Sequence, residues 1–327
     1  MTTNPSTNLL RAVLLGAGVL WGLTIAVSPL QIESGWDPLP LIFWQALVST
    51  VLLSLWMVAQ RRSFPLDRRT LVFYVIMALT GTAAPQVLSL AASDQIAVAV
   101  RSIMFALIPM ISLGFGLLFR IETVSGRRLL GLLLGFIAIG IIALFGSNNA
   151  GFGGKELSFL WFGTMLLVVA LYAFENNWVK LMMPGDMNPF VALLGANLFS
   201  VFLLIPVMLA QTDTWIGLPL AFDGIHARPT FMFWLVTAIQ IIAYGGFVFC
   251  IDKGGPAFAG QVSYIVTASG VLWGLIIFQQ ERLTPAIVIA LVVVLGGIAL
   301  VNPNRQGAAD KADGSDASKA DETAINR

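Results

Sequence analysis

The stretch Ala97–Met110, AVAVRSIMFALIPM, places one arginine in the middle of an apolar run. Moving an isolated guanidinium into hydrocarbon costs about 2.5 to 3.5 kcal/mol on insertion scales. Whether the run around Arg101 lies in a membrane or in the core of a soluble protein must therefore be settled first. Of the 327 residues, 57% are hydrophobic and only 11% are charged, and the mean hydropathy is +0.87. A soluble domain carries about 25% charged residues. The sequence therefore predicts an integral membrane protein in a lipid bilayer.

A membrane-spanning helix needs about 20 predominantly apolar residues. Working outward from Arg101, this rule predicts an all-α integral membrane protein with ten transmembrane helices, bounded by glycine, proline and charged residues. The first is too long, and lacks the cleavage site, to be a signal peptide, so we expect it to remain as a helix. Prolines at positions 85, 109 and 206 lie inside spans and predict kinks. The predicted spans are 9–31, 38–60, 70–92, 95–119, 128–146, 157–180, 190–211, 231–251, 256–279 and 285–302.

The distribution of charge predicts an orientation. Cytoplasmic loops of membrane proteins carry an excess of Lys and Arg. With the N-terminus inside, 14 of the 18 basic residues fall in cytoplasmic segments and 3 fall outside, while Arg101 lies within a span. We therefore expect both termini, residues 1–8 and a disordered polar tail at 303–327, to be cytoplasmic. The formal net charge of +1 argues against a nucleic-acid partner.

Cofactor and enzyme chemistry find little support in the sequence. Cys250 and His226 are the only cysteine and histidine, so neither an intramolecular disulfide nor a Cys/His metal site can form. The motif GFGGKE at Gly151–Glu156 faintly resembles a phosphate loop, but Glu156 stands where Ser or Thr would bind magnesium. We expect no cofactor and no metal. A membrane-embedded enzyme or a scaffold protein remains an alternative from a different class.

The two halves of the chain repeat each other. When the segments IETVSGRRLL and QERLTPAIVI are aligned, Glu122 falls on Glu281 and Ser125 on Thr284, a shift of 159 positions. Two halves of five spans each must lie in opposite senses because five is odd. The sequence thus predicts two inverted five-helix repeats with a site near the midplane between them. The predicted parts are a first repeat at 9–146, a periplasmic linker at 147–156 and a second repeat at 157–302.

Several short motifs carry a family resemblance. They are LWG at Leu20–Gly22, FALIPM at Phe105–Met110, and a glutamate followed by a polar turn and a glycine-rich last span. With ten spans in two halves, residues 9–302 resemble the EamA branch of the drug/metabolite transporter superfamily. The resemblance implies a small-molecule carrier of the bacterial inner membrane, commonly an exporter of amino acids or related solutes that works by alternating access. It does not identify the substrate.

Polar residues at helical spacing indicate which side chains could line a cavity, since residues three or four apart share a helix face. Intramembrane polar groups usually face the bundle interior. The alternative is that they form hydrogen bonds between helices, worth about 0.6 kcal/mol each on average. The candidate substrate contacts are Trp21 with Thr24 and Ser28, Gln86 with Thr82 and Ser89, Tyr172 with Asn176, Gln240 with Tyr244, and Gln261 with Tyr264.

Arg101 and Glu175 are the two ionisable candidates. Arg101 offers a planar fork of donors to a substrate carboxylate or phosphate. Glu175 could receive an ammonium group or carry a coupling proton. The structural alternatives are that Arg101 pairs with Asp94 or extends to the outer headgroups, and that Glu175 contacts Lys180 or the cytoplasmic interface.

A cation site and an anion site in one cavity suit a zwitterion. The sequence therefore predicts a carrier that takes a small zwitterionic or amphipathic metabolite from the cytoplasm and releases it outside. The runner-up is an exchanger of organic anions or phosphorylated metabolites, for which Arg101 matters and Glu175 does not. Whether the protein is a monomer or a homodimer stays open.

Overall fold

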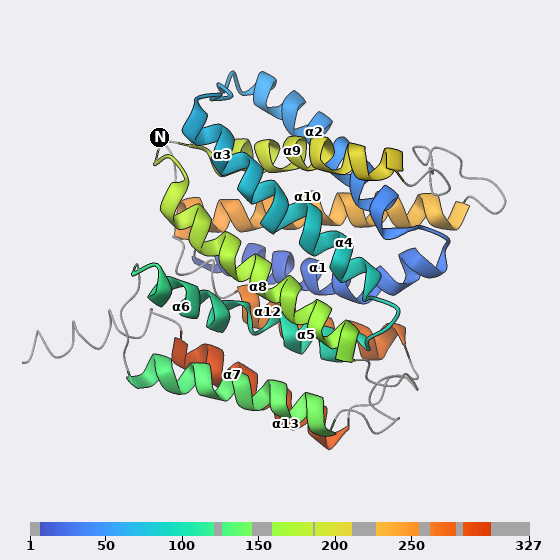
Figure 1. The fold of residues 1–327 in the computed structure, drawn as a ribbon, viewed down its shortest axis with the longest axis vertical. Coiled ribbons are helices and arrows are strands. Elements are labelled where there is room, and N and C mark those ends of the chain that lie inside the picture. The colour runs from blue at the N-terminus through green and yellow to red at the C-terminus, as the bar shows by residue number, and fades with distance from the viewer. Residues whose placement is uncertain are drawn as a thin grey trace, which may run out of the picture.

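The protein is a bundle of helices that lie side by side (Figure 1). The computed structural model describes residues 7–120, 126–145, 159–185, 187–210, 227–254, 262–278 and 284–301. Within these ranges the chain forms ten helical spans and no strand. Seven of the described helices are long and apolar enough to cross a membrane, and the other apolar helices are shorter.

The helices follow the predicted spans closely. Most limits differ from the prediction by three residues or fewer, whereas α10 begins four residues earlier and α12 is described from Val262, six residues after its predicted start. The third span comprises α3, η1 and α4, and the fourth comprises α5 and α6. In chain order the elements are α1 (Thr7–Glu33), α2 (Pro38–Ala59), α3 (Arg68–Met77), η1 (Ala78–Ala83), α4 (Ala84–Ala91), α5 (Val98–Phe105), α6 (Ile108–Leu118), α7 (Gly126–Phe145), α8 (Phe159–Met182), α9 (Pro189–Ala210), α10 (Ala227–Gly254), α12 (Val262–Ile277) and α13 (Pro285–Val301).

Proline interrupts two of the three spans in which a kink is predicted. A π-helical segment, η1, ends two residues before Pro85, because the proline ring has no N–H to continue the α-helical hydrogen bonds. The fourth span breaks between α5 and α6, and Pro109 lies in the first turn of α6. By contrast, α9 continues through Pro206 as an α-helix, and α1 continues through Pro29. The third and fourth spans are therefore the ones with irregular backbone at membrane depth.

Helix contacts place α5 at the centre of the bundle. Every residue from Val98 to Met104 is buried. In Figure 1, α7 pairs with α13 at one end of the bundle, and α2 pairs with α9 at the other. Between these pairs, α1 packs against α10 and α12, and α8 packs against the third and fourth spans. The interior of the bundle is thus formed by helices from both halves of the chain.

Outside the spans, Asp67 caps the start of α3. Its carboxylate accepts hydrogen bonds from the Thr70 backbone N–H at 3.1 Å and from the Thr70 hydroxyl at 2.7 Å. These hydrogen bonds lower the pKa of the exposed Asp67 carboxyl, and the bond from the Thr70 hydroxyl has the largest effect. The arrangement stabilises the helix start because free N–H groups there favour a carboxylate.

Small residues let α1, α5 and α12 approach closely. A side-chain carbon on Gly22 would meet the Ser269 hydroxyl and the backbone nitrogen of Gly270, and one on Gly270 would meet the Ser102 hydroxyl. Ser269 also donates a hydrogen bond of 3.1 Å to the Gly18 carbonyl. Close backbone packing of this kind is the usual way that membrane helices associate.

Replacing Gly22 with alanine should therefore destabilise the bundle. The added methyl group meets backbone, which cannot turn aside, and overpacking of this kind costs about 1 to 3 kcal/mol. We expect the thermal unfolding midpoint of the purified protein to fall. Gly16→Ala on the same helix is the matched control, because nothing lies within 4 Å of its added carbon. Equal midpoints for the two variants would contradict the close approach of α1 and α12.

Candidate functional site

A small polar cavity lies between six helices, toward the end of α1 that carries Glu33. Its volume is about 130 Å³. Four of the helices belong to the first half of the chain and two belong to the second. The lining residues are Thr24, Ile25, Ser28 and Gln31 of α1, Ile42 and Gln45 of α2, Gln86, Ser89 and Leu90 of α4, Arg101 and Phe105 of α5, Tyr172 of α8, and Val236 and Gln240 of α10.

Arg101 is the charged residue of the cavity lining. Its side chain is 1% exposed. One terminal nitrogen donates to the Ser28 hydroxyl at 2.8 Å and to the Ile25 carbonyl at 3.3 Å, and the other donates to the Ser89 carbonyl at 3.5 Å. These contacts hold the guanidinium in the cavity wall and join α5 to α1 and α4. Because the lining contains no carboxylate, the cavity is electropositive.

Two glutamine side chains add donors to the same cavity. Gln31 is 3% exposed, and its Nε2 atom has no hydrogen-bond partner among the described residues. The Nε2 atom of Gln45 is also buried and has no partner within the described part of the chain. A buried polar group left without a partner costs about 1 to 3 kcal/mol. The cavity therefore offers hydrogen-bond donors that protein atoms leave unused.

Next to the cavity, Trp21 joins α1 to α10. Its indole nitrogen donates a hydrogen bond of 2.9 Å to Oε1 of Gln240. The indole also packs on Phe247, with ring centroids 5.2 Å apart. This contact holds the Gln240 amide at the cavity wall.

Glu175 lies one turn along α8 from Tyr172, and its side chain is half-buried. Its carboxyl group occupies the space that a side chain at position 81 would fill, so Gly81 of η1 is what makes room for it. The hydroxyls of Tyr172 and Tyr244 are within electrostatic range of this carboxyl. Among the described residues it has no hydrogen bond or ion pair. Since π-helical turns occur frequently at functional sites, η1 and Glu175 are one candidate unit.

Aromatic contacts join the two halves of the chain on either side of the polar cavity. At the Glu33 end, Trp36 donates to the Pro229 carbonyl at 3.0 Å and stacks on Phe233 with centroids 5.8 Å apart. At the opposite end, Tyr74 stacks on Phe199 with centroids 6.1 Å apart. The polar cavity lies between these two contacts along the helix axes.

Comparison with known proteins identifies the first half of the chain. Residues 11–144, which cover nearly all of the first five spans, match the EamA-like transporter family. This part of the chain is an EamA-like transporter domain. It is a member of the drug/metabolite transporter superfamily, as the motifs of its sequence indicate, so its substrate is a small molecule. No protein with a curated description matches the sequence.

A protein of known crystal structure shares the fold of this EamA-like transporter. The two match with a TM-score of 0.55 and 15% sequence identity, over 90% of this chain and 96% of the other. At this identity the likeness concerns the fold alone.

Seven of the predicted contact residues of the transporter line the polar cavity, namely Thr24, Ser28, Gln86, Ser89, Arg101, Tyr172 and Gln240. Trp21 lies beside it through its bond to Gln240, and Glu175 lies one turn along α8 from Tyr172. Tyr244 packs against Phe190 and Phe247. Arg101 does not extend to the headgroups, because it is 1% exposed and bound to α1 and α4.

The remaining predicted contacts have other positions. Asn176 is exposed on α8 and does not line the cavity, while its neighbour Asn177 is buried and donates to the Ser112 carbonyl at 2.9 Å. Tyr264 packs against the apolar cluster around α5. Gln261 lies outside the described residues, as do the paired glutamates of the repeat junctions at 122 and 281, the linker at 147–156 and the tail at 303–327.

Two cavity residues, Gln31 and Gln45, are absent from the predicted set. Gln31 follows Ser28 by three positions and so continues the polar face of α1, which was a usable signal. Gln45 shares a face of α2 with Ser49, four positions later, which is a similar but weaker signal because its other neighbours at that spacing are apolar. The packing of α2 against the other helices then places Gln45 in the cavity lining.

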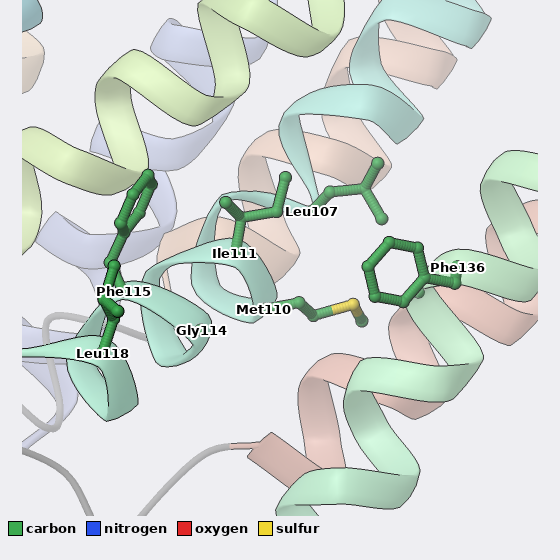
Figure 2. Close-up of a pocket in the computed structure, with 8 residues that line it drawn as sticks. Leu107, Met110, Ile111, Gly114, Phe115, Leu118 and Phe136 are labelled. Atoms are coloured by element: carbon green, nitrogen blue, oxygen red, sulfur yellow. The ribbon is translucent and has the colours of Figure 1, made fainter.

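A larger cavity of the transporter, about 320 Å³, is apolar throughout. Figure 2 shows it between α6 and α7, with Met110 of α6 directed toward Phe136 of α7. Phe136 is 67% exposed, so this groove opens on the outer surface of the bundle. With no polar side chain in its lining it cannot recognise a charged group. The polar cavity around Arg101 is therefore the candidate substrate site.

Proposed function

We propose that this transporter is a secondary carrier of a small zwitterion, such as an amino acid or a related metabolite. The observation that supports this most directly is the buried Arg101 in the cavity wall, with Glu175 close to Tyr172 of the same lining. The guanidinium binds the substrate carboxylate through charge-assisted hydrogen bonds. Glu175 receives the ammonium group or carries a coupling proton.

The proposed carrier consists of two inverted repeats, 9–146 and 157–302. Helix contacts support this. Each span of the first half has a counterpart five spans later, and the main helix contacts stay the same when every span is replaced by its counterpart. In the first half α1 packs on the eighth and ninth spans, and in the second half its counterpart α8 packs on the third and fourth. The pairs α2 with α9 and α7 with α13 map onto themselves. A substrate site between such repeats is typical of secondary transporters.

The proposed cycle opens the two ends of the bundle in turn. Trp36 with Phe233 closes the Glu33 end, and Tyr74 with Phe199 closes the other. Rocking of the repeats would break one contact while the other holds. The excess of basic residues in alternate loops supports cytoplasmic termini in a bacterial inner membrane, with the Glu33 end outside. Loading from the cytoplasm and release at the Glu33 end would make the protein an exporter, as a monomer or a homodimer.

A second candidate function is exchange of organic anions or phosphorylated metabolites. The specific observation in its favour is that the cavity lining contains an arginine and no carboxylate. In that case Glu175 takes no part in binding.

Flux in proteoliposomes tests both candidates. Labelled neutral and basic amino acids, sugar phosphates and quaternary amines are supplied with and without an imposed pH gradient. We expect neutral amino acids to move and the pH gradient to change their rate. Movement of sugar phosphates alone, with no response to pH, would replace the first candidate by the second. If no member of the panel moves under any gradient, both substrate assignments fail.

A further inference from the structure

We propose that Gln31 and Gln45 are substrate-binding residues that, with Arg101, form one oxyanion-binding cluster at the Glu33 end of the cavity. The ligand chemistry is an oxyanion, either a carboxylate or a phosphate group. The inference rests on the proposed function in taking this cavity as the substrate site.

The three side chains reach the cavity from three different helices. Gln31 comes from α1, Gln45 from α2 and Arg101 from α5, and all three line the same space. Ser28, one turn before Gln31, accepts the 2.8 Å hydrogen bond that holds the guanidinium. The α1 face that anchors Arg101 is thus also the face that presents Gln31.

The amide nitrogens of both glutamines are buried and donate no hydrogen bond to the described residues. Neither Nε2 atom has a partner among the described residues, and Gln31 is 3% exposed. A protein interior rarely leaves such groups unpaired, because each costs about 1 to 3 kcal/mol. Leucine at either position would avoid this cost. An acceptor that arrives from outside the protein accounts for both amides at once.

An oxyanion suits these donors better than other acceptors. Carboxylate and phosphate oxygens carry several lone pairs and are bound by groups of donors around them. Two neutral amides add hydrogen bonds without placing a second cation beside Arg101, which avoids a further desolvation cost. At about 130 Å³ the cavity is below the usual range of ligand pockets, so it takes a head group rather than a whole metabolite.

Leucine variants separate a binding role from a structural role. Gln31→Leu and Gln45→Leu are made in the full-length protein, with Gln95→Leu as the control. The Gln95 amide donates to Asp94 at 2.9 Å, and Gln95 does not line the cavity. The thermal unfolding midpoint is measured in detergent across a titration of sodium acetate and of inorganic phosphate, at constant ionic strength with chloride.

We expect both anions or one of them to raise the wild-type midpoint at low concentration. In Gln31→Leu and Gln45→Leu, the anion concentration that gives the same rise in midpoint should be about tenfold higher or more, since each variant loses a hydrogen bond to the charged anion. Without anion, these two variants should be at least as stable as wild type because an unsatisfied amide has been removed. A stronger response to acetate assigns a carboxylate, and a stronger response to phosphate assigns a phosphorylated substrate.

Two results would overturn the inference. One is a wild-type midpoint that responds to neither anion. The other is a lower midpoint in both leucine variants with an unchanged anion response, which would make the amides structural. The proposed function fails separately: anion binding that depends on the glutamines, with no flux of any panel compound, would leave the cluster in place and remove both substrate assignments.

Discussion

Arg101→Ala is expected to abolish measurable transport of any substrate that wild type carries. The variant loses the charge of the cavity lining and its hydrogen bonds to α1 and α4. A hydrogen bond to a charged group is worth about 1.5 to 3 kcal/mol, and two such bonds to a substrate oxyanion correspond to about a 100-fold or greater loss in kcat/KM. Labelled flux in proteoliposomes measures this directly.

Arg101→Ala removes contacts between helices as well as a donor fork, so a second variant is needed. Arg101→Lys keeps the charge and much of the length but loses the planar pair of donors. We expect it to fold and to raise KM more than it lowers kcat. Ser28→Ala removes only the 2.8 Å anchor of the guanidinium and should have an intermediate effect. Arg11→Ala, an exposed residue of α1, is the control. Wild-type kinetics in folded Arg101→Lys would show that Arg101 only holds helices together.

Glu175→Gln is expected to remove the response of transport to an imposed pH gradient. The substitution keeps the size of the side chain and therefore its fit against Gly81. It removes the ionisable group, so no proton can be carried at this position. Exchange of labelled for unlabelled substrate, which needs no coupling, should continue. A pH gradient that drives Glu175→Gln as well as wild type would contradict proton coupling through this residue.

Gly81→Ala tests the same unit with Glu175 still present. The added methyl group would take the space of the carboxyl group, so Glu175 must move. We expect gradient-driven transport to fall about tenfold or more, because displacement of a positioned group by about 1 Å can cost up to 100-fold. Gly140→Ala on α7 is the control, since nothing lies within 4 Å of its added carbon. If an imposed pH gradient drives transport by Gly81→Ala as well as by wild type, the position of Glu175 against η1 does not matter for transport.

Hydropathy made the spans predictable because crossing a bilayer is a requirement on each segment by itself. Each segment must bury its backbone hydrogen bonds and present apolar side chains over about 20 residues. The same local reasoning located the irregular backbone at Pro85 and Pro109, though not its form, a π-helical segment in one case and a break in the other. At Pro206 the backbone stays α-helical, because membrane helices tolerate proline where other groups satisfy the freed carbonyl.

The sequence by itself determined the membrane class, the approximate limits of the ten helices and the family resemblance, all of which depend on composition and local order. The tertiary structure decided which face of each helix meets the cavity. It turned Asn177 inward rather than Asn176, brought Gln31 and Gln45 to Arg101, and set Glu175 against Gly81. The physical reason is that the rotation of a membrane helix about its axis is set by packing against its neighbours, which hydropathy does not encode.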